Sequence, residues 1–216
     1  MAAYQTKSGF WVHDNQKLKW DKHINRKTGE PQYQMPQLEQ AIAECKRAGR
    51  MHTVIDGGAH VGLWTYHFAQ RFQRVLAFEP TVDSYECLRL NNKDKDNVKV
   101  YNLALSDHTG VLTMAPRKMG WEHVAEGTPN SIDLPCTTID SLELDRLDLL
   151  KLDIEGHEFE ALKGAVQTIT RYKPVIVVED KRDIRPGELP IHYLTDLGME
   201  LAHRLKHDHI FVWPQI

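Results

Sequence analysis

The sequence has few of the features that mark secreted, zinc-binding or membrane proteins. It contains three cysteines, Cys45, Cys87 and Cys136, which lie far apart and form no CxxC pair. This spacing argues against a disulfide framework and against a zinc site, and a reducing cytoplasm is the simplest compartment for such a chain. No apolar run approaches the roughly 20 residues of a membrane-spanning helix, and residues 1–7 lack the apolar core of a signal peptide. We therefore expect a cytoplasmic protein without a membrane segment.

An excess of positive charge is also missing. The formal net charge is −3, whereas domains that bind nucleic acid are usually basic, so a nucleic-acid partner is not favoured. Hydrophobic residues make up 41% and charged residues 26% of the chain, as in ordinary globular proteins. A chain of 216 residues is long enough to bury one sizeable core.

The most informative stretch is VIDGGAHVG at residues 54–62, where an apolar run ends in an acid and small residues follow. Residues 63–69 then have helical spacing, which predicts a strand, a tight turn and a helix. Glycine at the turn lets a ligand approach the backbone closely. A dinucleotide site needs G-x-G-x-x-G after the strand, and the register here gives Gly57, Ala59 and Gly62. Asp56 would repel a pyrophosphate but suits an ammonium or sulfonium group. The alternative to such a ligand site is an ordinary turn between a strand and a helix that binds no ligand.

Strand-like and helix-like runs alternate along most of the chain. One expected strand ends at Asp56, and the others cover residues 75–78, 98–101, 147–152 and 174–178. The expected helices cover residues 36–48, 62–71, 159–169 and 192–197, and a further helix includes Tyr85 and Leu88. This alternation predicts a mainly parallel sheet between two layers of helices. Residues 199–205 and 209–213 form an expected antiparallel hairpin, in which we interpret His207 and His209 as solvated edge residues rather than a metal pair.

Two segments stand outside this alternation. Residues 1–35 are polar and turn-rich with interleaved aromatic side chains, and we expect an N-terminal arm that packs on the domain or, alternatively, acts as a substrate lid. Residues 36–216 then form the domain itself. Within it, residues 116–135 look irregular. Because a long insertion of this kind often has a function, we expect it to lie over the carboxyl edge of the sheet.

Acids follow several of the expected strands at the point where each ends. They are Asp56, Glu79, Asp153 and the pair Glu179 and Asp180. Ligands of open parallel sheets bind outside the carboxyl ends of the strands. Glu79 lies roughly 20 residues after the glycine turn, where an acid commonly binds the ribose hydroxyls of a nucleoside. Together these features favour an adenosine-type ligand with a positively charged end, which S-adenosylmethionine fits better than NAD.

With these residues and some further motifs, the chain resembles the FkbM family of S-adenosylmethionine-dependent methyltransferases. The motifs are VIDGGAHVG at 54–62, FEP at 78–80, NLALSD at 102–107, LLKLDIEGHE at 149–158, KGA at 163–165 and KPVIVVE at 173–179. The family usually has Asn where His60 stands. The resemblance covers about residues 50–180 and implies an α/β, three-layer Rossmann-like class I methyltransferase fold. It also implies O-methylation of a hydroxyl on a sugar, glycan or small metabolite.

The resemblance implies roles for individual residues as well. Asp56 and Gly57 to Ala59 would hold the methionine part of the cofactor, and Glu79 would bind the ribose. Ala104 and Leu105 would lie near the adenine, and Asp153 at the bottom of the reaction site. The full set of candidate cofactor-binding residues is Asp56, Gly57, Gly58, Ala59, His60, Gly62, Thr65, Glu79, Pro80, Ala104, Leu105 and Asp153.

Methyl transfer to an oxygen also requires the loss of a proton, either to a general base or with the help of a metal. The candidate catalytic residues are Asp153, Glu155 and His157, and His157, at the opening of a helix, is the best-placed base. In the alternative mechanism, Asp153, Glu179 and Asp180 hold Mg²⁺, because hard carboxylate oxygens suit that ion. This arrangement is similar to that of metal-dependent catechol O-methyltransferases.

Two other functions remain open at this point. A basic, aromatic cleft formed by the N-terminal arm would support a nucleic-acid methyltransferase. An occluded acceptor side with intact cofactor motifs would support a non-catalytic binding domain that kept the fold.

Overall fold

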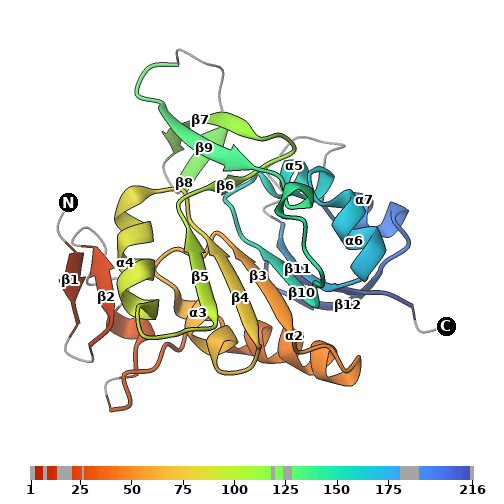
Figure 1. Cartoon of the computed structure of the whole chain (residues 1–216), viewed down its shortest axis with the longest axis horizontal. Coiled ribbons are helices and arrows are strands. Elements are labelled where there is room, and N and C mark those ends of the chain that lie inside the picture. The colour runs from red at the N-terminus through yellow and green to blue at the C-terminus, as the bar shows by residue number, and fades with distance from the viewer. Residues whose placement is uncertain are drawn as a thin grey trace.

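The structure is a computed structural model that describes residues 3–6, 9–13, 21–25, 27–117, 120–123, 128–180 and 190–214. Its centre is a seven-stranded sheet with the strand order β12-β13-β11-β10-β3-β4-β5 (Figure 1). The parallel strands are β3 (Thr53–Gly57), β4 (Arg74–Phe78), β5 (Val98–Tyr101), β10 (Leu149–Leu152) and β11 (Val175–Glu179). The last two strands, β12 (Glu200–Leu205) and β13 (Asp208–Val212), form the expected hairpin, and β13 pairs antiparallel with β11. The predicted mainly parallel sheet is confirmed.

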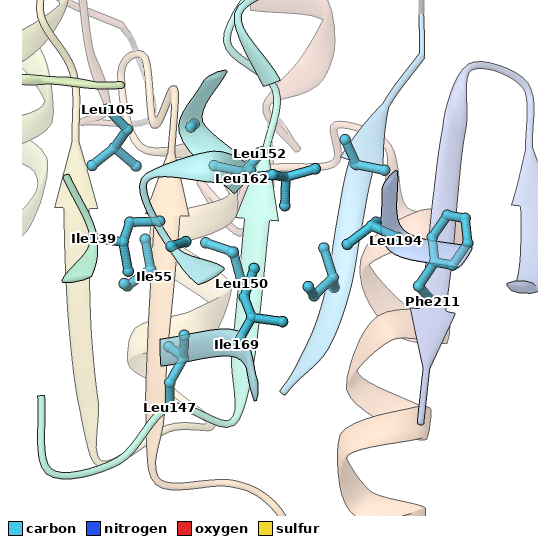
Figure 2. Packing of buried hydrophobic residues seen from close by; sticks show 14 of the residues in the cluster. Ile55, Leu105, Ile139, Leu147, Leu150, Leu152, Leu162, Ile169, Leu194 and Phe211 are labelled. Carbon is cyan, nitrogen blue, oxygen red and sulfur yellow. The ribbon is translucent and has the colours of Figure 1, made fainter. Parts of the chain in front are cut away.

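Both faces of this sheet are covered by helices, because successive residues of each buried strand point to opposite faces. Val54 and Leu149 pack on one face, under α2 (Met35–Arg47) and α3 (Leu63–Ala69), and α4 (Val82–Asn92) covers the same face beside β5. Ile55 and Leu150 pack on the other face, under α5 (Glu158–Lys163), α6 (Val166–Tyr172) and α7 (Pro190–Asp196), as Figure 2 shows. The predicted three-layer fold is therefore confirmed.

Residues 116–135, which were expected to be irregular, contribute strands to a second, smaller sheet. Its four strands are β6 (Ala104–Leu105), β7 (Gly110–Arg117), β8 (Gly120–His123) and β9 (Ile132–Thr137), in the order β6-β9-β7-β8. Residues 116–135 contain β8 and parts of β7 and β9, so that expectation was wrong for these strands. Alternate residues Leu112, Met114 and Leu134 are buried on one face of this sheet and give it a core of its own. The small sheet lies at the top of Figure 1, beyond the end of β5. Residues 118–119 and 124–127 lie outside the described residues.

The predicted single helix over 159–169 is in fact two helices, α5 and α6, which are separated at Gly164. A Cβ atom on Gly164 would lie 2.0 Å from the carbonyl oxygen of Ser106. The helix therefore breaks where another segment of backbone approaches too closely for any side chain. A short 3-10 helix, η3 (Asp140–Leu142), contacts α6.

The described parts of the N-terminal arm pack against α4. Strands β1 (Ala3–Gln5) and β2 (Trp11–His13) form a hairpin beside α4 (Figure 1), followed by the 3-10 helix η2 (Asp21–His23). The side-chain amide of Asn91 donates to the carbonyl of Trp11 at 2.9 Å and to that of Val61 at 2.8 Å. One α4 residue thus ties the arm to the turn between β3 and α3. Among the described residues, no helix is long and apolar enough to cross a membrane.

Candidate functional site

The glycine turn between β3 and α3 contacts the carboxyl ends of the two neighbouring strands, β4 and β10. The backbone N–H groups of Gly58 and Ala59 donate to the carbonyl of Phe78 at the end of β4, at 3.0 and 2.9 Å. Gly58 has a φ of +70°, and a Cβ atom there would lie 1.9 Å from the carbonyl oxygen of Asp153. His60 and Gly62 also have positive φ, of 52° and 91°. Left-handed backbone is uncommon for residues other than glycine, asparagine and aspartate, so His60 holds an unusual conformation in this turn.

Asp56 is enclosed by the protein, and its predicted role in holding the methionine part of the cofactor stays a prediction. Its side chain is 0% exposed. The hydroxyl of Thr65 donates to Asp56 Oδ2 at 2.6 Å, and Lys151 Nζ lies 3.1 Å from Asp56 Oδ1. The cation that neutralises Asp56 is therefore a lysine of β10, which the sequence analysis missed. A lysine inside a strand expected to be buried on both faces was the available signal.

Glu79 lies next to the glycine turn, where a ribose-binding residue is needed. Its carboxylate accepts hydrogen bonds from the backbone N–H of His60 at 3.0 Å, from the backbone N–H of Thr81 at 3.0 Å and from the Thr81 hydroxyl. The side-chain amide of Asn102 donates to the carbonyls of Glu79 and Pro80. Burial raises the pKa of the Glu79 carboxyl above its ordinary value, against the effect of these hydrogen bonds.

A small apolar cavity of about 40 Å³ adjoins the glycine turn. Its lining residues are Gly58, Phe78, Pro80, Leu103, Ala104, Leu105, Leu112, Met114, Leu134, Ile154 and His157. Phe78 at the end of β4 and the loops after the parallel strands supply part of the lining, and the small sheet supplies Ala104, Leu105, Leu112, Met114 and Leu134. Ala104, Leu105 and Pro80 are among the residues predicted from the resemblance, whereas Leu112, Met114 and Leu134 are not: residues 111–114 were expected only as a short extra strand, and Leu134 lies in the segment expected to be irregular. The lining is almost entirely apolar, as is usual for the surface that meets the base of a nucleoside.

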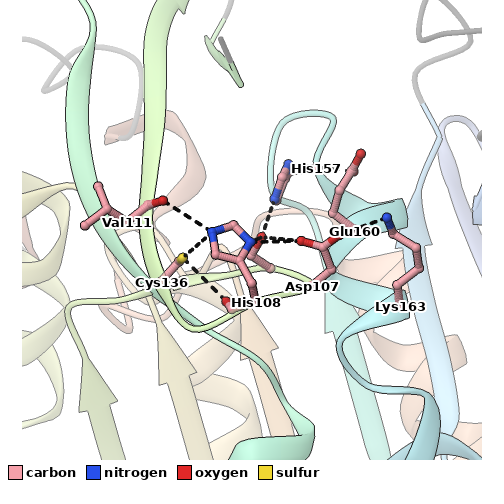
Figure 3. A network of polar contacts seen from close by, with 8 residues as sticks. Asp107, His108, Val111, Cys136, His157, Glu160 and Lys163 are labelled. Carbon is pink, nitrogen blue, oxygen red and sulfur yellow. Dashed lines mark hydrogen bonds and ion pairs between the residues drawn. The ribbon is translucent and has the colours of Figure 1, made fainter. Parts of the chain in front are cut away.

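His157 belongs to this side of the site and has partners within the protein. It is 5% exposed, and its Nε2 lies 3.0 Å from the hydroxyl of Ser106, while Nδ1 lies 3.6 Å from Glu160 Oε2 (Figure 3). A general base must come within hydrogen-bond reach of the proton that it removes. His157 therefore contacts two protein groups beside the apolar cavity, and its role as the general base stays a prediction.

The neighbouring contacts in Figure 3 fix the loop between β6 and β7. Lys163 Nζ lies 2.9 Å from Asp107 Oδ2, and His108 Nδ1 lies 3.0 Å from Asp107 Oδ1. The His108 ring and the Lys163 ammonium hold the pKa of the Asp107 carboxyl well below its usual range. These contacts anchor the base of the small sheet to α5.

The loop that follows β10 carries the other candidate catalytic residues. Asp153 is half-buried, and Glu155 is exposed with a φ of 59°. The carboxylate of Glu158 accepts hydrogen bonds from the backbone N–H groups of Ile154 at 2.8 Å and Gly156 at 3.2 Å, which fixes the loop. Burial raises the pKa of Glu158 to about 7, although these N–H groups oppose the change. The catalytic roles of Asp153 and Glu155 stay predictions.

A polar cluster lies on the acceptor side, at the carboxyl ends of β10 and β11. Asp208, the first residue of β13, pairs in register with Glu179, and its Oδ2 accepts a hydrogen bond from the side-chain amide of Gln37 at 3.1 Å. Burial, and then the charge of Asp153, raise the pKa of Asp208 to about 6. The same two effects raise the pKa of Tyr33 to about 12. Asp208 and Tyr33 were missed, because only acids that follow parallel strands were considered.

One histidine of the terminal hairpin is buried. His209 is 2% exposed, so its interpretation as a solvated edge residue was wrong: β13 lies inside the sheet and β12 forms the edge.

Glu179 and Asp180 are buried at the carboxyl end of β11, near the half-buried Asp153. Within the described ranges there is no group of three or more His, Cys, Asp or Glu side chains that could hold a metal ion. The magnesium prediction therefore has no support.

Comparison with known proteins places this site in a family context. The model of the methyltransferase FkbM domain matches residues 56–205. The methyltransferase sdnD of Sordaria araneosa is 28% identical over 193 residues, which cover 69% of this chain and 74% of that protein. The 2-O-methyltransferase NoeI of Sinorhizobium fredii is 21% identical over 169 residues, which cover 67% of this chain and 70% of that protein.

Solved structures support the fold. The FkbM methyltransferase of Methylobacillus flagellatus superposes with a TM-score of 0.55 and 20% identity. The match covers 77% of this chain and 46% of that one, so this chain spans about half the length of that protein. Monomeric WbdD also gives a TM-score of 0.55, with 12% identity over 97% of this chain and 45% of that one.

Proposed function

The chain belongs to the FkbM methyltransferase domain family, and we propose that it transfers a methyl group from S-adenosylmethionine to a hydroxyl of a small-molecule or glycan acceptor. When bound, this cofactor supplies a methyl group activated by a sulfonium. The protein then has to align the acceptor with that methyl group, keep water out and accept the proton that the hydroxyl loses.

The observation that carries the proposal is the position of Glu79, whose carboxylate accepts a hydrogen bond from the glycine turn at His60 and whose neighbour Pro80 lines the apolar cavity. A ribose bound by Glu79 would lie beside the turn. The adenine would then extend toward the apolar cavity and its lining residues Leu105 and Leu112. A nucleoside cofactor therefore fits the arrangement of charged and apolar groups.

The acceptor side supports a hydroxyl-bearing acceptor that is not phosphorylated. Asp153, Asp208 and Tyr33 supply carboxylate and phenol groups there, which bind hydroxyl groups well and repel phosphate. We assign the loss of the acceptor proton to the Asp153 carboxylate, because a half-buried carboxylate at the end of β10 can accept a proton from a hydroxyl within hydrogen-bond reach. The name of NoeI, a 2-O-methyltransferase, agrees with transfer to oxygen.

Calorimetric titration with S-adenosylmethionine and with S-adenosylhomocysteine tests the cofactor part of the proposal. Glu79→Ala should weaken binding roughly tenfold or more, since a hydrogen bond to a charged group contributes about 1.5–3 kcal/mol. Glu86→Ala is the matched control, because Glu86 is exposed on α4 and pairs only with its neighbour Arg89 among the described residues. Binding of NAD by the wild-type protein, without binding of S-adenosylmethionine, would overturn the proposal.

The acceptor part is tested with isotope-labelled S-adenosylmethionine and a panel of neutral sugars, their phosphates and short RNA. We expect label in the neutral sugars and its loss in the Asp153→Asn variant. Transfer to RNA alone would show that the acceptor class is wrong.

A further inference from the structure

Lys151 is a charged residue in the most protected part of the molecule. It lies in β10, the central strand between β3 and β11, and is 5% exposed. Of the residues that the structure describes, it is the only lysine or arginine that is buried. Burying an ammonium group costs several kcal/mol unless its charge and its donors are all satisfied, so its surroundings need an explanation.

All the contacts of the Lys151 ammonium are with β3 and the glycine turn. Lys151 is the direct register partner of Asp56, and its Nζ lies 3.1 Å from Asp56 Oδ1. It also donates to the carbonyl of Gly57 at 3.0 Å and to that of Gly58 at 2.9 Å. The ammonium has three donors, and all three point at the segment that opens the cofactor site.

Without this lysine the two glycine carbonyls would lose their side-chain donor, although the backbone N–H of Asp153 also donates to Gly57 at 3.2 Å. Gly58 has a positive φ, and glycine has a wide choice of backbone conformations. The same peptide units present the N–H groups that bond to the carbonyl of Phe78, and Gly58 lines the apolar cavity. Fixing the carbonyls therefore also fixes the surface that would meet the cofactor.

The charge of Lys151 also affects the ionisation of other acidic groups of the site. Burial by itself lowers the pKa of Lys151, but the carboxylates of Asp56 and Asp153 more than offset this, so the ammonium stays charged. Its positive charge in turn favours the ionised form of Glu79 and Asp208. Lys151 is thus shared by the cofactor side and the acceptor side.

We propose that Lys151 is a positioning residue, which holds the Gly57 and Gly58 carbonyls and so keeps the turn in the conformation that binds the cofactor. This inference rests on the proposed function. A simpler alternative is that Lys151 only neutralises the buried charge of Asp56. The two alternatives differ in what happens when both charges are removed together.

The experiment compares S-adenosylhomocysteine affinity, measured by calorimetry, with thermal stability in single and double variants. Lys151→Met keeps an unbranched apolar side chain but removes all three donors, and we expect binding to weaken about 10- to 100-fold. This variant leaves Asp56 buried without its cation and will be unstable. The double variant Asp56→Asn with Lys151→Met contains neither charge, so it should recover stability, and it remains informative if the single variant does not fold.

In the double variant we still expect binding at least about tenfold weaker than in the wild type, because both glycine carbonyls have lost the lysine and only Gly57 keeps a donor, the backbone N–H of Asp153. Wild-type affinity in the double variant would show that Lys151 only balances Asp56, and would overturn the proposal. Wild-type affinity in Lys151→Met would overturn it as well. By contrast, a wild-type protein that does not bind S-adenosylhomocysteine refutes the proposed function itself.

A matched control lies at the other end of the same strand. Arg146 Nε bonds to both carboxylate oxygens of Asp148, at 2.9 and 3.0 Å, and Asp148 is 1% exposed. Arg146→Met therefore also deprives a buried acid of its cation, but far from the glycine turn. It should lose stability and keep its affinity for S-adenosylhomocysteine. An equal loss of affinity in Arg146→Met and Lys151→Met would mean that binding reports stability alone, and would count against the proposal.

Discussion

Asp208 should make the protein less stable as the pH rises from about 4 to about 7. Burial raises its pKa from 3.8 to about 6 in the folded protein, so the folded state holds the proton more tightly than the unfolded state does. Between these two values the folded state binds more protons, and the free energy of unfolding must fall as the pH increases. At 1.36 kcal/mol per pKa unit, the difference corresponds to about 3 kcal/mol.

The perturbation that isolates this effect is Asp208→Asn. Asparagine has nearly the same shape, and its carbonyl oxygen can still accept the hydrogen bond from Gln37, but it does not titrate. Urea denaturation of both proteins at closely spaced pH values gives the free energy of unfolding for each. The variant should become more stable relative to the wild type by up to about 3 kcal/mol between pH 4 and pH 7.

Comparison of the two proteins removes the contribution of other acids, such as Glu158, whose pKa is also raised. Asp94→Asn, in an exposed turn, controls for the removal of one negative charge. Parallel curves for the wild type and Asp208→Asn would refute the reasoning, since they would mean that Asp208 ionises equally easily in the folded and unfolded states.

Two further predictions concern the glycine turn and the cavity. Gly58→Ala should lower the free energy of unfolding by more than about 2 kcal/mol, because its Cβ would overlap the carbonyl oxygen of Asp153. Gly198 has a similar positive φ, but a Cβ atom there would have no neighbouring atom within 4 Å. Thermal denaturation of Gly58→Ala and Gly198→Ala therefore separates the effect of steric overlap from that of backbone strain. Leu112→Ala should weaken S-adenosylhomocysteine binding roughly tenfold by removing apolar contact with the adenine, whereas Val111→Ala, at a side chain that is 60% exposed, should bind normally in the same titration.

The large sheet and its helices could be predicted from the sequence because their signals are local. Each parallel strand is a short apolar run that ends in a polar residue, and each following helix has apolar residues at helical spacing. The position of Glu79 beside the glycine turn followed from one general rule, that ligands bind at the carboxyl edge of a parallel sheet. No knowledge of distant contacts was needed for either.

The small sheet could not be predicted in the same way, because its signal is not local. Leu112 and Met114 on β7 become a buried face only when β9 brings Leu134 opposite Leu112. The intervening residues include Pro129 and Asn130, which favour turns and obscure the strands on either side. The break between α5 and α6 has a similar origin, since the contact that forces it at Gly164 comes from Ser106.

Lys151 and Asp208 show what a closer reading of the strands could have found. A lysine in a strand buried on both faces requires a carboxylate on a neighbouring strand, and the register pairs Lys151 with Asp56. In the same way, an antiparallel strand begins at the edge where its parallel neighbour ends, so an acid at its start, such as Asp208, belongs to the same site. The ion pair between Lys151 and Asp56 also affects the choice of cofactor. The charge of Asp56 by itself would favour a sulfonium over a pyrophosphate, but Lys151 neutralises that charge inside the protein. The preference for S-adenosylmethionine therefore rests on Glu79, the apolar cavity and the family, and no longer on the sign of Asp56.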